Sequence, residues 1–259
     1  MGFQPNRAQR WAAPTFADPL PMHPRLKNWL LRLALEGNKV KCPTCGKGAM
    51  AFLPAGSPPR PHSLCIYCGS RERTRMMALA LSKRGLPRSG QRILHVAPDK
   101  SLRERLQGAP GVTYVAGDKM EPGYSYPPGT IYLDITEIKF PDDHFDVIIC
   151  SHVLEHVPDD RKAMRELLRV LKPGGTAILQ VPMSREATTD EDPAVTDPEE
   201  RMQRFGQFDH VRLYGRDYFD RLRDEGFAVT VLRPIEWLTR MEIFEYGVKF
   251  EEELVVGTK

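Results

Sequence analysis

The stretch FDVIICSHVLEHVPDDRKAMRELLRVLKPGGTAILQVP, residues 145–182, decides the fold of this chain. It opens with a continuous apolar run rich in β-branched side chains at 145–150, which is typical of a strand covered on both faces. Residues 161–171 then form an amphipathic helical pattern that a Lys-Pro-Gly-Gly turn ends, and residues 176–181 predict the next buried strand. Because strands alternate with helices, the pattern predicts a parallel, doubly wound α/β sheet.

The segments on both sides of this stretch extend the same pattern. Residues 93–96 form a short apolar run that reads as another buried strand, and a helical pattern begins at Ser101. Further strands are expected at 112–118 and 131–135. Near the end of the chain, residues 227–232 and 253–256 predict the last two strands.

Residues 140–182 resemble class I S-adenosylmethionine-dependent methyltransferases of the broad type 11 group. The resemblance rests on FPDDHFDVIICSHVLEHVPDD and ELLRVLKPGGTAILQVP, and it extends over about residues 91–259. It implies a Rossmann-like, seven-stranded sheet whose last strand is antiparallel. It also implies methyl transfer with S-adenosylmethionine as the cofactor.

The first half of this region departs from the family pattern. The family's glycine-rich loop, which lets backbone approach the cofactor closely, is replaced here by HVAPDKS at 95–101. Ala97 is small enough to serve at one of the glycine positions. Asp99 is expected to reach the ammonium or sulfonium group of the cofactor. His95 stands where the family usually has an acid, and we expect it to contact the cofactor too.

The resemblance places further cofactor contacts at the ends of the other strands. Asp118 would accept hydrogen bonds from the ribose hydroxyls, which suits a bidentate carboxylate. Asp134 would accept from the adenine amino group. For both aspartates the alternative is a turn or cap role. The remaining contacts are Met120 and Ile135 at the adenine, and Ser151 and His152 at the methionine moiety.

The acceptor side of the site is expected in a long insertion, 183–214, which we interpret as a lid. The segment FGQFDHVRLYG within it alternates aromatic with basic side chains, and a solvated loop does not account for this pattern. His210 is the candidate base. The substrate contacts would come from Phe208, Arg212 and Tyr214. His156 is a second candidate base, with cofactor packing as its alternative.

A second motif lies upstream. The pairs Cys42/Cys45 and Cys65/Cys68 are each followed by a glycine, and together they offer four thiolates for a tetrahedral Zn²⁺. Two disulfides or a redox pair are the alternatives. A site with four cysteine ligands has no open coordination position, so we predict a structural zinc.

These motifs divide the chain into three parts. Residues 1–37 form an arm and a helix, residues 38–85 the zinc knuckle and a connecting helix, and residues 86–259 the methyltransferase domain. The first helix has an apolar face, made by Leu26, Trp29, Leu30 and Leu33, that we expect to pack against the main domain. Three arginines, at 71, 73 and 75, oppose the dipole at the start of the connecting helix. They are expected to meet an acidic loop such as 191–200, or a bound phosphate.

The composition fits a globular protein, with 41% hydrophobic and 27% charged residues. The net charge of +3 neither requires nor excludes nucleic acid. No run is long enough to span a membrane and the N-terminus lacks an apolar signal core, so we expect a cytoplasmic protein without a membrane partner. The aromatic segment 235–250 is interpreted as cover for the active-site mouth or as a homodimer contact, and both readings stay open.

The function expected from the sequence is methyl transfer to an O, N or S atom of a small-molecule or sugar-like acceptor. One alternative is an RNA or protein methyltransferase that grips its substrate with the knuckle and the three arginines. The other is a non-catalytic binding module that keeps the fold but has lost the cofactor site.

Overall fold

The computed structural model describes residues 24–56, 58–121, 123 and 125–259, so the predicted arm at 1–23 lies outside the described residues. Its centre is a seven-stranded sheet in the order β12-β13-β9-β8-β5-β6-β7. Strands β7, β6, β5, β8 and β9 pair in parallel, whereas β13 runs antiparallel to both β9 and β12. The predicted α/β sheet with an antiparallel last strand is therefore confirmed. Its strands are β5 (Arg92–Val96), β6 (Thr113–Asp118), β7 (Thr130–Tyr132), β8 (Phe145–Ser151), β9 (Leu171–Gln180), β12 (Ala228–Leu232) and β13 (Leu254–Thr258).

Two hydrophobic clusters cover the two faces of this sheet. On one face Leu94 and Ile148 pack with side chains of α4 (Asp160–Val170) and α6 (Tyr218–Asp224). On the other face Ile93 and Ile149 pack with α2 (Glu72–Lys83) and α3 (Lys100–Gln107). Neighbouring residues of one strand point to opposite faces, so both must be apolar in a doubly covered sheet. This is why the strands read as unbroken apolar runs.

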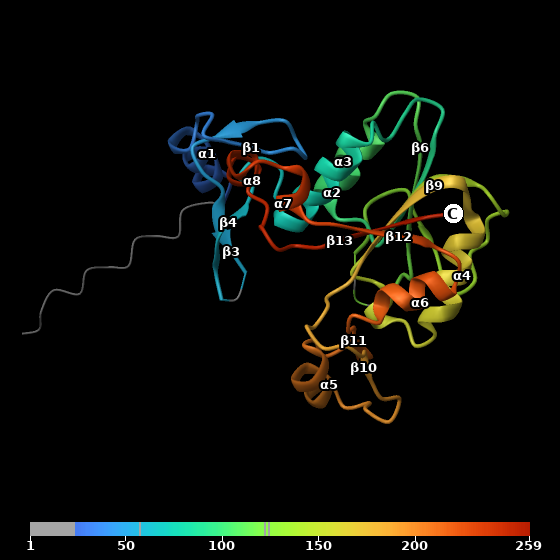
Figure 1. Cartoon of the computed structure of the whole chain (residues 1–259). Coiled ribbons are helices and arrows are strands. Elements are labelled where there is room, and N and C mark those ends of the chain that lie inside the picture. Colours follow the sequence, from blue (N-terminus) through green and yellow to red (C-terminus); the bar gives the residue numbers. More distant parts are fainter. Residues whose placement is uncertain (1–23, 57, 122, 124) are drawn as a thin grey trace, which may run out of the picture.

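The cysteine-rich region forms a small module beside the sheet. It contains two short antiparallel pairs, β1 (Val40–Lys41) with β2 (Gly48–Ala49), and β3 (Leu53–Ala55) with β4 (Arg60–Leu64). The chain returns to this module after β12 through α7 (Pro234–Trp237) and α8 (Arg240–Tyr246), and α8 contacts β1 (Figure 1). The segment 234–246 thus joins the module to the sheet, because β13 follows it.

The insertion forms a separate projection at the carboxyl edge of the sheet (Figure 1). It contains α5 (Pro198–Phe205) and the antiparallel pair of β10 (Asp190–Glu191) with β11 (Arg212–Leu213). The projection packs on η1 (Leu154–His156), the short 3₁₀ helix that follows β8.

The apolar face of α1 (Pro24–Ala34) does not pack as the sequence predicts. Its four large side chains, those of Leu26, Trp29, Leu30 and Leu33, are each between 41% and 56% exposed. The prediction that this face packs against the main domain is therefore wrong for the described residues. Periodicity identifies an apolar face, but it does not say what covers that face.

The sequence predicts that Arg75 meets an acidic loop or a phosphate, but it binds backbone carbonyls instead. Its side chain is fully buried, and its guanidinium lies over the ring of Phe52 with the Cζ atom 3.9 Å from the ring centroid. All five N–H groups donate to backbone carbonyls at 2.6–2.9 Å, namely those of His62, Ser63, Ser70, Tyr246 and Gly247. Burial lowers the pKa of Arg75. The acidic loop at 191–200 takes no part in this cage.

Replacing the Arg75 side chain should therefore destabilise the whole assembly. We expect Arg75→Met to lower the free energy of unfolding by at least about 3 kcal/mol, since several buried carbonyls would lose their donor. The measurement is chemical denaturation followed by circular dichroism. Arg73→Met, two residues away on the same helix and exposed, is the matched control and should change the free energy by less than about 0.5 kcal/mol. Equal stability of the two variants would contradict a structural role for the cage.

Candidate active site and metal centre

A cavity of about 490 Å³ lies at the carboxyl ends of β5 and β8. One wall comes from the loop after β5, where the family's glycines are replaced, together with Ser151 and His152 after β8. The other wall comes from the cysteine module and the start of α2. Its residues are Cys68, Gly69, Arg71, Arg73, Thr74 and Met77. Parallel α/β sheets bind ligands at this edge, so the altered loop lies where the resemblance predicts a cofactor.

The loop after β5 is held by its own hydrogen bonds. Asp99 is the N-cap of α3, and its Oδ1 accepts from the amides of Ser101 and Leu102, each at 3.1 Å, and from Ser101 Oγ at 2.7 Å. The aspartate therefore shapes the loop, and a direct bond from Oδ1 to the cofactor is not supported. Ala97 has a φ of 44°, in a backbone region that residues other than glycine rarely adopt. A small residue thus takes the conformation of one missing glycine.

His95 lines the same cavity but is almost entirely buried. Its Nδ1 lies 2.9 Å from the hydroxyl of Tyr114. Burial, helped by the nearby charge of Arg103, lowers the pKa of His95 to about 3. The imidazole is therefore neutral near neutral pH and does not replace the family's acid as a charged cofactor contact.

The residues predicted at the ribose and adenine lie farther along the edge, outside the lining of this cavity. Asp118 ends β6, and burial raises the pKa of its carboxyl. Asp134 Oδ1 accepts from the amide of Thr136 at 2.8 Å and from its hydroxyl at 2.7 Å, and these bonds lower the Asp134 pKa. This is the turn role named as the alternative. Ile135 is buried in the core, whereas Met120 is half-buried with a φ of 59°.

A second, larger cavity of about 1140 Å³ adjoins the first, and both are lined by Arg71, Arg73 and His152. Its other walls are the segment 180–185 after β9 and the segment 249–253 before β13. Ile235 and Phe250, from the aromatic segment before the last strand, also line it.

The charges around this larger cavity are unevenly paired. Arg60 pairs with Glu72, and Arg216 and Arg233 both pair with Glu253. Among the described residues, Arg71, Arg73 and Arg185 have no ion pair. The sequence singles out Arg71 and Arg73, because they oppose the helix dipole. Arg185 lies in a polar loop and carries no such signal.

Two of the predicted substrate contacts are packing residues in this structure. Arg212 is buried and donates to the carbonyls of Leu154 and Pro158 at 3.0 and 2.8 Å, and to Glu191 at 2.9 Å. Tyr214 is fully buried and donates to Asp160 at 2.7 Å. Neither side chain lines the larger cavity, so we assign both to anchoring the insertion. Their mixed polarity resembles that of a binding surface, and the sequence pattern does not reveal their burial.

The other three predicted acceptor-side residues also lie outside both cavity linings. Phe208 is 48% exposed. His210 and His156, which are distant in the sequence, are brought together with their ring centroids 4.7 Å apart. The two candidate bases therefore contact each other, and neither lines a cavity.

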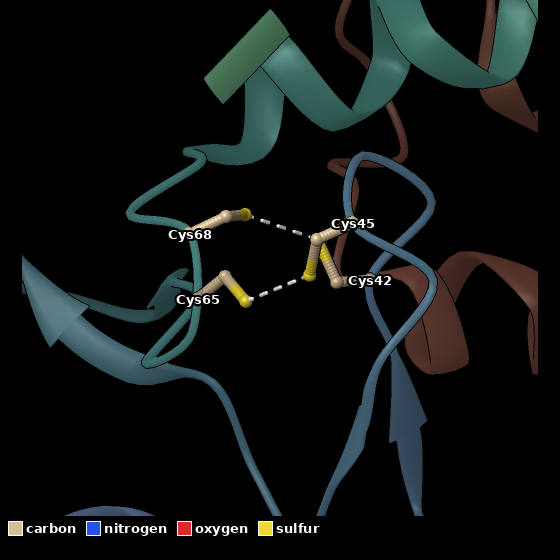
Figure 2. Close-up of side chains that lie close together, drawn as sticks. All are labelled: Cys42, Cys45, Cys65 and Cys68. Carbon is tan, nitrogen blue, oxygen red and sulfur yellow. Dashed lines mark hydrogen bonds between the residues drawn. The ribbon is translucent and has the colours of Figure 1, made fainter. Parts of the chain in front are cut away.

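The four predicted metal ligands converge (Figure 2). Cys42 Sγ lies 3.7 Å from Cys68 Sγ, and Cys45 Sγ lies 3.9 Å from Cys65 Sγ. Sulfur atoms around a tetrahedral zinc, with Zn–S bonds of about 2.3 Å, are about 3.8 Å apart. Free thiols in this geometry fit a metal better than the predicted alternative of two disulfides, and all four cysteines are free.

The two halves of this cluster have the same backbone geometry. The amide of Gly46 donates to the carbonyl of Cys42 at 2.8 Å, and that of Gly69 to Cys65 at 2.9 Å. Both glycines have a φ of 76°, which explains why glycine follows each cysteine pair. The cluster therefore suits a structural Zn²⁺ that would close an otherwise small module.

Removal of zinc should loosen this module selectively. After treatment with a strong chelator, we expect backbone amides of residues 40–70 to exchange with solvent much faster, because the thiolates no longer hold the two halves together. Hydrogen exchange with mass spectrometry measures this. The amides of β8 and β9 in the same sample are the internal control, and unchanged exchange at 40–70 would rule out a structural metal.

Comparisons with known proteins agree with this architecture. Residues 84–179 match a family described as a methyltransferase domain. A demethylmenaquinone methyltransferase from Clavibacter sepedonicus is 34% identical over 110 residues, which are 39% of this chain and 45% of that protein. A 2-phytyl-1,4-naphtoquinone methyltransferase from Synechococcus elongatus is 30% identical over 134 residues, 50% of this chain and 49% of that protein. The chain thus spans about half the length of these curated relatives.

Two solved structures are similar to this chain at lower identity. An S-adenosylmethionine-dependent methyltransferase from Archaeoglobus fulgidus has a TM-score of 0.47 at 14% identity, and covers 72% of this chain and 94% of its own. A structure of the Haloferax volcanii Trm112 methyltransferase activator with a protein described as a methyltransferase has a TM-score of 0.45 at 19% identity. The match covers 72% of this chain and 93% of the other. Within the described residues, no helix combines the length and apolar character needed to cross a membrane. Residues 84–179 thus match a methyltransferase domain, and the sheet has the strand order that the resemblance to class I S-adenosylmethionine-dependent methyltransferases implies.

Proposed function

We propose that this protein transfers the methyl group of S-adenosylmethionine to an O, N or S atom of a small, anionic acceptor. The observation that carries the proposal is the pair of adjoining cavities at the carboxyl edge of the sheet, of about 490 and 1140 Å³. They meet at His152, Arg71 and Arg73. A cofactor in the smaller cavity would therefore face an acceptor in the larger one.

The residues present fit the cofactor, although the glycine-rich loop is missing. Ala97, Ser151 and His152 would contact the methionine moiety, and the partly buried carboxyl of Asp118 would accept the ribose hydroxyls. Arg71 or Arg73 would bind the methionine carboxylate, because these guanidinium groups lack an acidic partner within the described residues. When bound, S-adenosylmethionine supplies an already activated methyl group.

The proposed role of the protein in the reaction is to bind, to orient and to exclude water. The acceptor atom forms a bond to the methyl carbon while the carbon–sulfur bond breaks, and the electron pair of that bond stays on sulfur. A hydroxyl acceptor also loses a proton, which solvent at the cavity mouth would take up. No step needs a base among the cavity residues.

The acceptor class follows from the charges around the larger cavity. Arg185 lines it and has no ion pair within the described residues, and the same holds for whichever of Arg71 and Arg73 does not bind the cofactor carboxylate. Lys249 also lines it but pairs with Glu252. Unpaired cations near low-dielectric walls attract anions. A phosphate or carboxylate on the acceptor, as in an acidic sugar, would match them. The names of the quinone methyltransferase relatives do not mention an anionic acceptor.

Cofactor binding is the first test. In calorimetric titration with S-adenosylhomocysteine, we expect micromolar binding by the wild-type chain. Asp118→Ala should weaken it at least tenfold, since hydrogen bonds to a charged acceptor contribute about 1.5–3 kcal/mol. The control is Glu137→Ala, which removes an exposed acid in the segment that follows β7. Absence of binding at millimolar ligand would refute the proposed enzyme.

The two cavity arginines give a second test. We expect the double variant Arg71→Gln, Arg73→Gln to bind S-adenosylhomocysteine about 10–100-fold more weakly, because the carboxylate loses its charged donors. Arg88→Gln, an exposed arginine of the linker, should bind like the wild type. If the double variant keeps full affinity, the arginines serve the acceptor or nothing, and the proposed carboxylate contact is wrong.

A further inference from the structure

A second cluster of potential ligands lies outside the cysteine module. One ligand atom each from Glu155, His156 and His210 lies within 4.8 Å of the others. Glu155 and His156 belong to η1, directly after β8, and His210 comes from the insertion. The amide of Val211 donates to the carbonyl of Glu155 at 2.9 Å, which ties the two segments together at the cluster.

Glu155 is the unusual member of this cluster. It is fully buried, and neither of its carboxylate oxygens has a hydrogen-bond partner. The Nδ1 atom of His152 lies 3.2 Å from Glu155 Oε1, but without hydrogen-bond geometry. A buried carboxylate without a partner costs several kcal/mol, so natural proteins supply a cation or a donor at such a position.

Both histidines are oriented as metal ligands usually are. His210 is buried, and its Nδ1 lies 3.0 Å from the carbonyl of Phe205. His156 Nδ1 lies 3.3 Å from Asp209 Oδ2. Histidines that bind a metal commonly donate one ring N–H to a carbonyl or carboxylate, which leaves the other nitrogen free for the metal. In both rings that free nitrogen is Nε2.

We propose that Glu155, His156 and His210 bind a divalent transition metal. Two imidazoles and one carboxylate form a donor set that suits zinc and its neighbours, and three protein ligands leave at least one position open. Donor atoms around such a metal lie about 3.3 Å apart, so ligand atoms within 4.8 Å of one another would close by up to about 1.5 Å on binding. This site is separate from the cysteine cluster and has no thiolate.

The open position has a route to the cavities. His152 is next to Glu155 on one side and lines both cavities on the other. The side chain of Asp209 is 39% exposed and that of His156 is 30% exposed, so water reaches the cluster from outside. A metal here would accept water or an oxygen ligand in its open position.

Cobalt is a suitable probe, because its spectrum distinguishes the two sites. Wild-type full-length chain produced with cobalt should hold two equivalents. The cysteine site should give intense sulfur-to-cobalt charge-transfer absorption, and the second site only weak visible bands. We expect Glu155→Gln and His210→Gln each to retain the charge-transfer absorption and to lose one equivalent. Elemental analysis of untagged protein gives the stoichiometry.

Two controls test whether loss of the second equivalent is specific to the cluster. His144→Gln and Glu137→Gln remove the same side-chain types outside the cluster and should keep both equivalents. If the cluster variants do not fold by circular dichroism, zinc titration of the wild-type chain decides, and binding of a second equivalent is then expected. A single equivalent in the wild-type chain, or a second that persists in both cluster variants, would overturn the proposal.

Discussion

The five hydrogen bonds of the Arg75 guanidinium hold the two parts of this protein together. Their acceptors belong to the cysteine module on one side and to the end of α8 on the other. The side chain itself extends from α2, which packs on the sheet. Because every N–H group is paired in a buried cage, loss of one segment would leave donors and carbonyls of the others unsatisfied. Arg75 thus ties the cysteine module to the sheet, together with the bond from Arg105 on α3 to the carbonyl of Pro43.

That position matters because the module completes the smaller cavity. In the family pattern, a glycine-rich loop alone brings backbone close to the cofactor. Here the loop carries Ala97 and an aspartate N-cap, and the facing wall is made by Cys68, Gly69 and the arginines at the start of α2. A structural zinc that orders Cys68 would therefore also order this wall. Under the proposed function, the zinc would support cofactor binding through the geometry of this wall, without a shared ligand.

The sequence predicted the sheet and the cysteine cluster well, because both depend on local spacing. An apolar run or a CxxC pair has the same meaning wherever the rest of the chain lies. The roles of the charged residues were harder to predict, since the burial of Arg75 and of Arg212 depends on carbonyls far away in the sequence. Asp99 and Asp134 were ambiguous for the opposite reason, because a carboxylate that caps a turn and one that binds a ligand occupy the same sequence positions.

The insertion shows how such long-range burial contributes to a site. Arg212 and Arg221 share the carboxylates of Asp160 and Glu191, and Tyr214 donates to the same Asp160. A buried network of this kind rarely adds much net stability, because desolvation offsets the attraction. What it gives is a single geometry, since each partner fixes the others. Two members of the network, Arg212 and Tyr214, closely follow His210 in the chain, and between them and His210 the amide of Val211 donates to the carbonyl of Glu155. The polar residues of the insertion are therefore best understood as the frame that brings a distant imidazole to η1.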